Sequence, residues 1–188
     1  MAKEASACRI ILGIDPGLHI SGFGIIKKDG RSSYLLDCGY LSMPSSHHLK
    51  ERIHTFFDFF TKKIALYGVT DIALETPFLG KNTQSFLKLG YLRGIIYLLA
   101  HQHVLELYEF SPRQVKQSIT GMGRAAKEQV AFFLKNMFSM TELPKELDAT
   151  DAVAVAVCHY LQMKNPVAKS GVKSWSDFVK KNPDKVKK

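Results

Sequence analysis

Cysteine is scarce in this sequence, and the number and spacing of the cysteines exclude several classes of protein. The three cysteines lie far apart, and no two of them form a C-x-x-C pair. This pattern excludes a disulfide framework and a cysteine zinc site and favours a reducing compartment, so we expect a cytoplasmic protein. No apolar run approaches the ~18 residues of a membrane span, and the N-terminus lacks the layout of a signal peptide. The remaining composition, 46% hydrophobic and 23% charged over 188 residues, is that of one globular domain.

Acidic residues are also in the minority. The chain has 17 of them against 26 lysines and arginines, which gives a formal net charge of +9. The excess is concentrated after residue 163, where eight lysines and two aspartates give +6. A basic protein suggests a polyanionic partner such as nucleic acid, but the rest of the chain is too nearly neutral for charge alone to identify one.

The same basic segment is poor in apolar residues. We therefore predict a globular domain over residues 1–163 and a mobile tail over 164–188. Three roles for the tail stay open: a solvated segment that aids solubility, an arm that binds duplex phosphates, and a docking peptide anchored by Trp175 and Phe178. We favour DNA contact over docking because lysines outnumber aromatic residues there.

Short apolar runs bounded by turn residues predict five strands. The first run is almost unbroken and ends at Asp15, which is typical of a central strand covered on both faces. Asp29-Gly30 is typical of a hairpin turn, so the first three strands should form an antiparallel meander. The expected strands span residues 8–15, 22–28, 33–43, 71–75 and 104–110.

Apolar residues at helical spacing predict five helices between and after these strands. Ser45 and Ser46 are candidate caps for the first, which Gly68 should end. Gly90 and Gly94 lie four residues apart and leave one helix face bare, which could allow another helix to pack closely. The expected helices span residues 49–68, 83–103, 112–120, 125–138 and 147–162. The element order predicts an α/β fold: a mixed five-stranded sheet with helices on both faces.

Four acids lie at the ends of these elements. Asp15 and Glu75 each end an apolar strand, where an uncompensated carboxylate would be costly to desolvate. Asp148 and Asp151 lie three apart near the start of the last helix, so both project to one side. Crowded carboxylates raise one another's pKa unless a cation neutralises them, and magnesium prefers such oxygen ligands. The acids therefore indicate a magnesium site for phosphoryl transfer, although each acid alone could simply be a strand-end or helix-start residue.

Six segments in order carry a family resemblance. They are GIDPG around Asp15, LE before Phe78 with Lys81, LKLG at 87–90, PRQVKQ at 112–117, GxG at 121–123 followed by Lys127, and DAxDA at 148–152. Over about residues 9–163 the chain resembles the RuvC family of bacterial Holliday-junction resolvases, which has an RNase H-like fold.

The resemblance implies a specific activity. RuvC proteins are homodimers that use Mg²⁺ to cut two like-polarity strands of a four-way DNA junction symmetrically, during recombination and repair. The resemblance also implies two Mg²⁺ ions per active site, with Mn²⁺ able to substitute, and a junction-branch-migration complex as a further partner. The residues that it assigns by position are the catalytic and metal-binding acids Asp15, Glu75, Asp148 and Asp151, the catalytic and DNA-binding Lys127, and the DNA contacts Phe78, Lys81, Arg113 and Lys116.

Two other functions are compatible with parts of the pattern. An actin-like phosphotransferase also has a strand-end aspartate with glycines, but it would need a second glycine-rich loop late in the chain, where only Gly171 occurs. A non-catalytic junction-binding module would have no need of all four acids. The apolar stripe of Phe132, Phe133, Met137 and Phe138 is expected to lie in the core.

Overall fold

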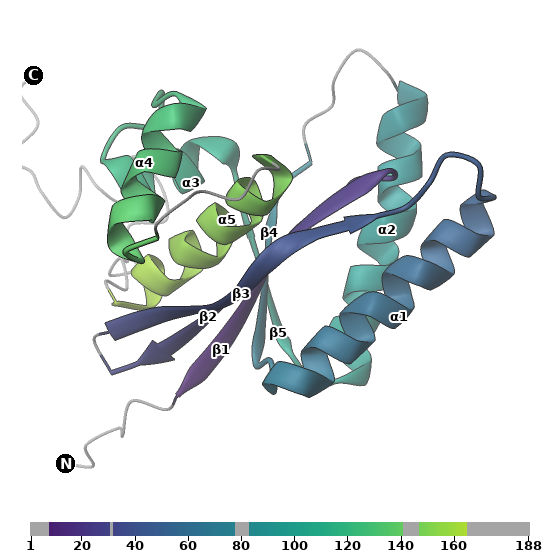
Figure 1. Ribbon diagram of the computed structural model, residues 1–188, viewed down its shortest axis with the longest axis horizontal. Helices are drawn as coiled ribbons and strands as arrows, with labels where there is room; N and C mark the ends of the chain where they lie inside the picture. Colours follow the sequence, from purple (N-terminus) through teal and green to yellow (C-terminus); the bar gives the residue numbers. More distant parts are fainter. Residues whose placement is uncertain (1–7, 31, 78–82, 141–146, 165–188) are drawn as a thin grey trace, which may run out of the picture.

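The computed structural model describes residues 8–30, 32–77, 83–140 and 147–164. Five strands form one sheet in the order β3-β2-β1-β4-β5 (Figure 1). Strands β1, β2 and β3 pair antiparallel, whereas β4 pairs parallel with both β1 and β5. The expected meander and mixed sheet are both confirmed. The strand bounds are β1 Arg9–Asp15, β2 Ile20–Asp29, β3 Ser32–Ser42, β4 Asp71–Glu75 and β5 Glu106–Phe110.

Five helices cover the two faces of this sheet. Helices α1 and α2 pack on one face, and α3, α4 and α5 pack on the other (Figure 1). Both faces are therefore buried, which explains why β1 and β2 read as apolar runs. Within the described residues, no helix is both long and apolar enough to cross a membrane. The helix bounds are α1 Leu49–Tyr67, α2 Thr83–Gln102, α3 Pro112–Thr120, α4 Lys127–Met137 and α5 Leu147–Lys164.

Two of the predicted helix ends are confirmed by their caps. Ser111 caps α3 by accepting a hydrogen bond from the Gln114 amide, with Pro112 in the first turn. Gly68 ends α1 in the left-handed conformation, with φ of 63°. The expected caps Ser45 and Ser46 are wrong: α1 begins after His48, whose backbone N–H donates to the Glu51 carboxylate.

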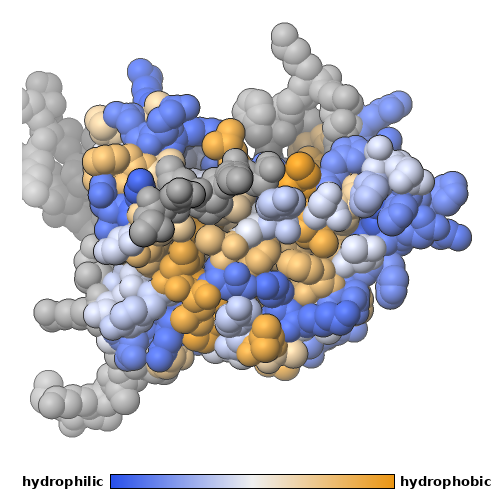
Figure 2. All heavy atoms as spheres, in the orientation of Figure 1, coloured by the Kyte–Doolittle hydropathy of each residue, from blue (hydrophilic) through white to orange (hydrophobic). Residues whose placement is uncertain are grey.

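Large side chains fill the space between the sheet and helices α1 and α2. Phe56 and Phe60 of α1 and Leu92 and Ile96 of α2 are fully buried there. Figure 2 shows hydrophobic residues also at the surface in the middle of the view, where Figure 1 places the edge strand β3. Leu36, exposed to 41%, belongs to that strand.

The aromatic stripe of α4 is not part of the core as expected. Val130 and Leu134 are the buried residues of this helix, whereas Phe132 is 63% exposed and Phe133 and Met137 also face solvent. Of the predicted stripe, Phe138 packs against the core as a partly buried residue. Helix α4 carries apolar residues on two sides, and only one side meets α5 and α3.

Candidate active site

Glycines on β1 and β2 let α5 lie directly against the sheet backbone. A Cβ atom added at Gly13 would lie 2.0 Å from the carbonyl oxygen of Ala152, and one at Gly22 would lie 1.9 Å from that of Asp148. Any larger residue would push the helix away, so glycine is required here for the close approach. The contact places the first turns of α5 over the end of β1, where Asp15 lies.

The four acids predicted from the sequence lie close enough to act on one another. The pKa of Asp15 is raised from 3.8 to about 7, first by burial and then by the charges of Asp151, Asp148 and Glu75. Lys127 opposes this shift. Asp15 is thus the centre of the acid cluster, and a carboxylate there is stable only beside positive charge.

Glu75 reaches the same space from the neighbouring strand. Its pKa is raised by burial and by Asp151, and Lys127 and Lys116 lower it. Arg93 of α2 donates a hydrogen bond of 2.8 Å to the backbone carbonyl of Glu75 and forms an ion pair with Glu109. The end of β4 is therefore fixed by a side chain from the opposite face of the sheet.

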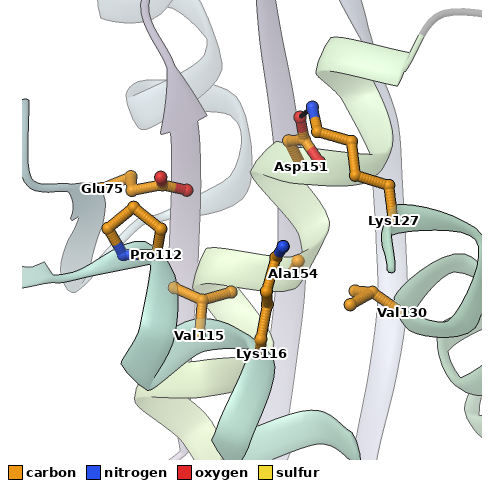
Figure 3. Close-up of a pocket in the computed structure, with 8 residues that line it drawn as sticks. All are labelled: Glu75, Pro112, Val115, Lys116, Lys127, Val130, Asp151 and Ala154. Carbon is orange, nitrogen blue, oxygen red and sulfur yellow. Dashed lines mark hydrogen bonds and ion pairs between the residues drawn. The ribbon is translucent and has the colours of Figure 1, made fainter. Parts of the chain in front are cut away.

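Lys127 is the cation in closest contact with the acids. Its Nζ lies 2.5 Å from Oδ2 of Asp151, and this hydrogen bond raises the pKa of the lysine (Figure 3). Lys116 points up from α3 toward the space between Glu75 and Asp151 (Figure 3). The two lysines thus border the acid cluster on the side formed by α3 and α4.

Two adjoining hollows open between these elements, and both are lined by Glu75, Lys127 and Asp151. One, of about 170 Å³, also touches Lys116. The other, of about 270 Å³, also touches Asp15 and the nearly buried Arg93. Together they form a groove with acids at its centre and cations along its sides, which suits a phosphodiester held beside a metal ion.

The donor set fits hard divalent cations. Carboxylate oxygens are the ligands that Mg²⁺ and Mn²⁺ prefer, and the raised pKa of Asp15 shows that the cluster has too much negative charge for its burial. Among the described residues, no three His, Cys, Asp or Glu side chains already surround one point as a ready ion site. Asp151 is turned toward Lys127 instead, so binding an ion by three acids requires side-chain rotation.

The other predicted site residues divide into two groups. Arg113 is exposed on α3 and packs over Gly123, where an added Cβ would lie 2.7 Å from its Cγ. Phe78 and Lys81, like Trp175 and Phe178 of the predicted tail, lie outside the described residues.

Sequence reasoning missed two parts of the site. The glycines of β1 and β2 form no phosphate-loop signature, and their role becomes visible only where α5 meets them. Arg93 lies on a helix whose other residues are largely apolar, and its contact with Glu75 joins residues 18 apart in the chain. A lone arginine within an apolar helix is the available signal.

Comparison with solved structures identifies the class of protein. The fold matches the Thermus thermophilus RuvC in complex with Holliday junction substrate, with a TM-score of 0.79 and 26% sequence identity, over 83% of this chain and 95% of that one. The fold and the acid-lined groove therefore define a nuclease of the RNase H-like class.

Sequence comparison is more specific. Residues 11–159 match the family described as crossover junction endodeoxyribonuclease RuvC. The protein of that name from Cytophaga hutchinsonii is 44% identical over 95% of this chain and 88% of its own length. That from Porphyromonas gingivalis is 40% identical over 95% and 97%. The chain belongs to the RuvC family, and the predicted Holliday-junction nuclease activity is confirmed at that level; family membership also implies a divalent-metal requirement.

Proposed function

We propose that this chain resolves four-way junctions by paired symmetric nicks during recombination and repair, with Mg²⁺ as its cofactor, two ions per active site and Mn²⁺ able to substitute. The observation that supports this most directly is the convergence of three acids on Asp15, whose pKa is raised to about 7 by burial and by these neighbours. A divalent cation stabilises such a cluster because it supplies the positive charge that the acids lack.

In this proposal Asp15, Glu75, Asp148 and Asp151 hold the metal. Bound ions supply an activated water and stabilise the leaving oxygen. The groove orients the phosphodiester beside the bound ions. Arg93 keeps Glu75 in place by donating a hydrogen bond to the backbone carbonyl of Glu75. The acids act only when deprotonated, which couples metal binding to the loss of the Asp15 proton.

The lysines serve the substrate rather than the metal. Because the Asp151 hydrogen bond raises the pKa of Lys127, this side chain stays protonated and presents positive charge to the scissile phosphate. Lys116 and Arg113 extend the cationic border along α3 toward the DNA backbone. On the family resemblance, Phe78 stacks on bases near the junction centre and Lys81 contacts DNA beside it.

Symmetric nicks need two active sites, and we propose a homodimer formed through α2. Leu87, Tyr91 and Leu98 are exposed on one stripe of this helix, between 44% and 61%. Gly90 and Gly94 lie on the same stripe, and an added Cβ at either would have nothing within 4 Å. A second copy of the helix could therefore approach closely and cover these apolar residues.

The dimer is tested by placing a charge on that stripe. Leu87→Lys should shift the sedimentation of the protein toward the monomer and replace paired nicks by single ones. Leu66→Lys on α1 is the matched control, because Leu66 is also an exposed leucine on a helix. A Leu87→Lys protein that sediments as wild type would exclude this face.

The chemistry is tested on a synthetic four-way junction with each strand labelled in turn. Cleavage should require Mg²⁺ or Mn²⁺, stop in EDTA, and map to symmetric positions on two strands of like polarity. Nicks that persist in EDTA, or that fall on one strand only in the dimer, would contradict the proposal.

The remaining expectations concern cellular context. Cys8, Cys38 and Cys158 are free thiols, which fits a reducing cytoplasm. The junction-branch-migration complex is the partner that the family resemblance implies, and a pull-down of its purified subunits with the full chain tests that contact.

A further inference from the structure

A polar cluster lies under α5 at the end of the sheet opposite the acids. Its centre is Asp71, the first residue of β4, which is fully buried. Oδ1 of Asp71 accepts a hydrogen bond of 2.9 Å from Nη2 of Arg9. Oδ2 accepts one of 2.5 Å from the hydroxyl of Thr70, and Nε2 of His159 lies 3.4 Å from Oδ1. None of these groups takes part in the proposed chemistry.

Strand geometry connects this cluster to the acids. Side chains on a strand alternate between faces, so Arg9 and Asp15, six apart on β1, point to the same face. Asp71 and Glu75, four apart on β4, share that face as well. The face is the one that α5 covers, since Ile11 and Ala73 between them belong to the α5 core.

Helix geometry extends the connection to α5. His159 follows Asp148 by eleven residues, which is close to three turns, so the two side chains lie on nearly the same side of the helix. His159 is 97% buried, and its ring stacks on that of Tyr108 with 4.0 Å between centroids. The cluster thus takes one residue from each of the three elements that carry the acids: Arg9 from β1, Asp71 from β4 and His159 from α5.

The apolar contacts of α5 are non-directional, so they fix its position along the sheet less sharply than hydrogen bonds do. The part of its buried face that meets the strand glycines consists of small residues, namely Ala152, Val153 and Ala156. Hydrogen bonds to a buried carboxylate, in contrast, are directional and costly to break. A buried ion pair adds little net stability, so its main effect here is on geometry.

We infer that Asp71 is a positioning residue: it ties Arg9 and His159 together and so fixes α5 against β1 and β4, setting the spacing of the four acids. The inference rests on the proposed function for its consequence, which is the affinity of the acids for metal. It concerns the structure of α5 in its own right, so it can be tested with and without metal.

The sharpest variant is His159→Phe. Phenylalanine keeps an aromatic ring against Tyr108 but removes the nitrogen that faces Asp71, while Arg9 and Thr70 still satisfy the carboxylate. Amide hydrogen exchange should become faster in α5 than in wild type and stay unchanged in α1. The Kd for Mn²⁺, measured by calorimetry on the DNA-free protein, should rise about 10-fold, the scale for residues that orient metal ligands. Junction binding in EDTA should not change.

Two further variants separate positioning from general stability. His159→Gln keeps a side-chain N–H donor and should restore most of the Mn²⁺ affinity. Phe60→Leu lies in the other core and should lower the free energy of unfolding without changing the Kd for Mn²⁺. Asp71→Asn should reproduce the effect of His159→Phe, since it weakens the link from the strand side.

Wild-type exchange in α5 of both His159→Phe and Asp71→Asn would overturn the inference, as would an equal loss of Mn²⁺ affinity in Phe60→Leu. Failure of the proposed function is distinguishable. A wild-type chain that bound no Mn²⁺ would contradict the metal site, and exchange in α5 would still decide whether Asp71 positions the helix.

Discussion

The two faces of the sheet are packed in different ways. Toward α1 and α2 the contact is made by large side chains such as Phe56, Phe60 and Leu92. Toward α5 it is made by glycine on the strands and by alanine and valine on the helix, with backbone against backbone. Large interdigitating side chains bury much apolar area, whereas backbone contact fixes the distance between elements to a fraction of an ångström.

The difference has a functional meaning. All four acids lie on the α5 face or at its edge, where their spacing depends on how closely the helix approaches. The α1 and α2 face supplies most of the large buried side chains and, through Arg93, one contact with the site. The comparison predicts that mutations on the two faces affect different properties: stability on one, and chemistry on the other.

The largest effect on stability is expected from Phe60→Ala. Removing a fully buried phenylalanine should lower the free energy of unfolding by about 3–5 kcal/mol, measured by urea denaturation. Cleavage per folded molecule should stay near wild type, because the acids do not contact this side chain. A loss of cleavage beyond the unfolded fraction would break the distinction between the faces.

The next largest effect should come from Asp148→Asn, which changes charge on the α5 face and almost no volume. Junction cleavage should fall at least about 100-fold, the scale for removing one group that stabilises charge at a reacting centre. Junction binding should stay normal or tighten slightly, because a negative charge near the phosphates is lost. Asp58→Asn on α1 is the control, and normal turnover by Asp148→Asn would remove this residue from the catalytic set.

A matched pair of glycine substitutions compares the faces directly. In Gly22→Ala the new Cβ would lie 1.9 Å from the Asp148 carbonyl, so α5 must shift; we expect roughly 1–3 kcal/mol of destabilisation and reduced cleavage. In Gly39→Ala the Cβ would lie 3.3 Å from the edge of the Phe23 ring, which can yield. Thermal unfolding and cleavage assays on both variants should show the larger loss for Gly22→Ala, and equal losses would contradict the comparison.

The last expected effect is a pH dependence that comes from Asp15. Its folded pKa of about 7 lies above the unfolded value of 3.8, so between these values the native state holds a proton that the unfolded chain has lost. Metal-free protein should therefore lose stability as pH rises from about 4 to 7, with a slope of at most about 1.4 kcal/mol per pH unit from one group. Denaturant midpoints across this range measure it, and Asp15→Asn should flatten the slope.

The sequence predicted the elements whose signals are local. Apolar runs located β1 and β4, and their terminal residues Asp15 and Glu75 were identified as site residues because a carboxylate is unexpected at the end of such a run. The spacing of Asp148 and Asp151 placed both on one side of α5. No single segment contains the information that brings these residues to Asp15. Their convergence could therefore be proposed only from the chemistry of carboxylates and from the family resemblance.

Most of the features that escaped prediction depend on tertiary contacts. Helical spacing predicts α4 but does not indicate which of its two apolar sides meets the core. The assignment of Phe132 and Phe133 to the core is therefore wrong. The start of α1 is local, but the usual preference for serine as a cap did not indicate it: the helix begins after His48, whose backbone N–H donates to the Glu51 carboxylate. The link from Arg9 to Asp71 joins residues 62 apart in the chain, and no local pattern indicates it.

The contact of α5 with β1 and β2 also has a consequence for the newly made chain. The helix that carries Asp148 and Asp151 packs on strands that leave the ribosome more than a hundred residues earlier. At about 5–20 residues per second, the interval between synthesis of Glu75 and of Asp151 is roughly 4–15 s. During that time β1 and β2 have been synthesised, but the surface formed by their glycines is not yet covered by α5. A nascent chain of this length therefore has Asp15 and Glu75 but not Asp148 and Asp151, and under the proposed function nuclease activity arises only when the last helix docks.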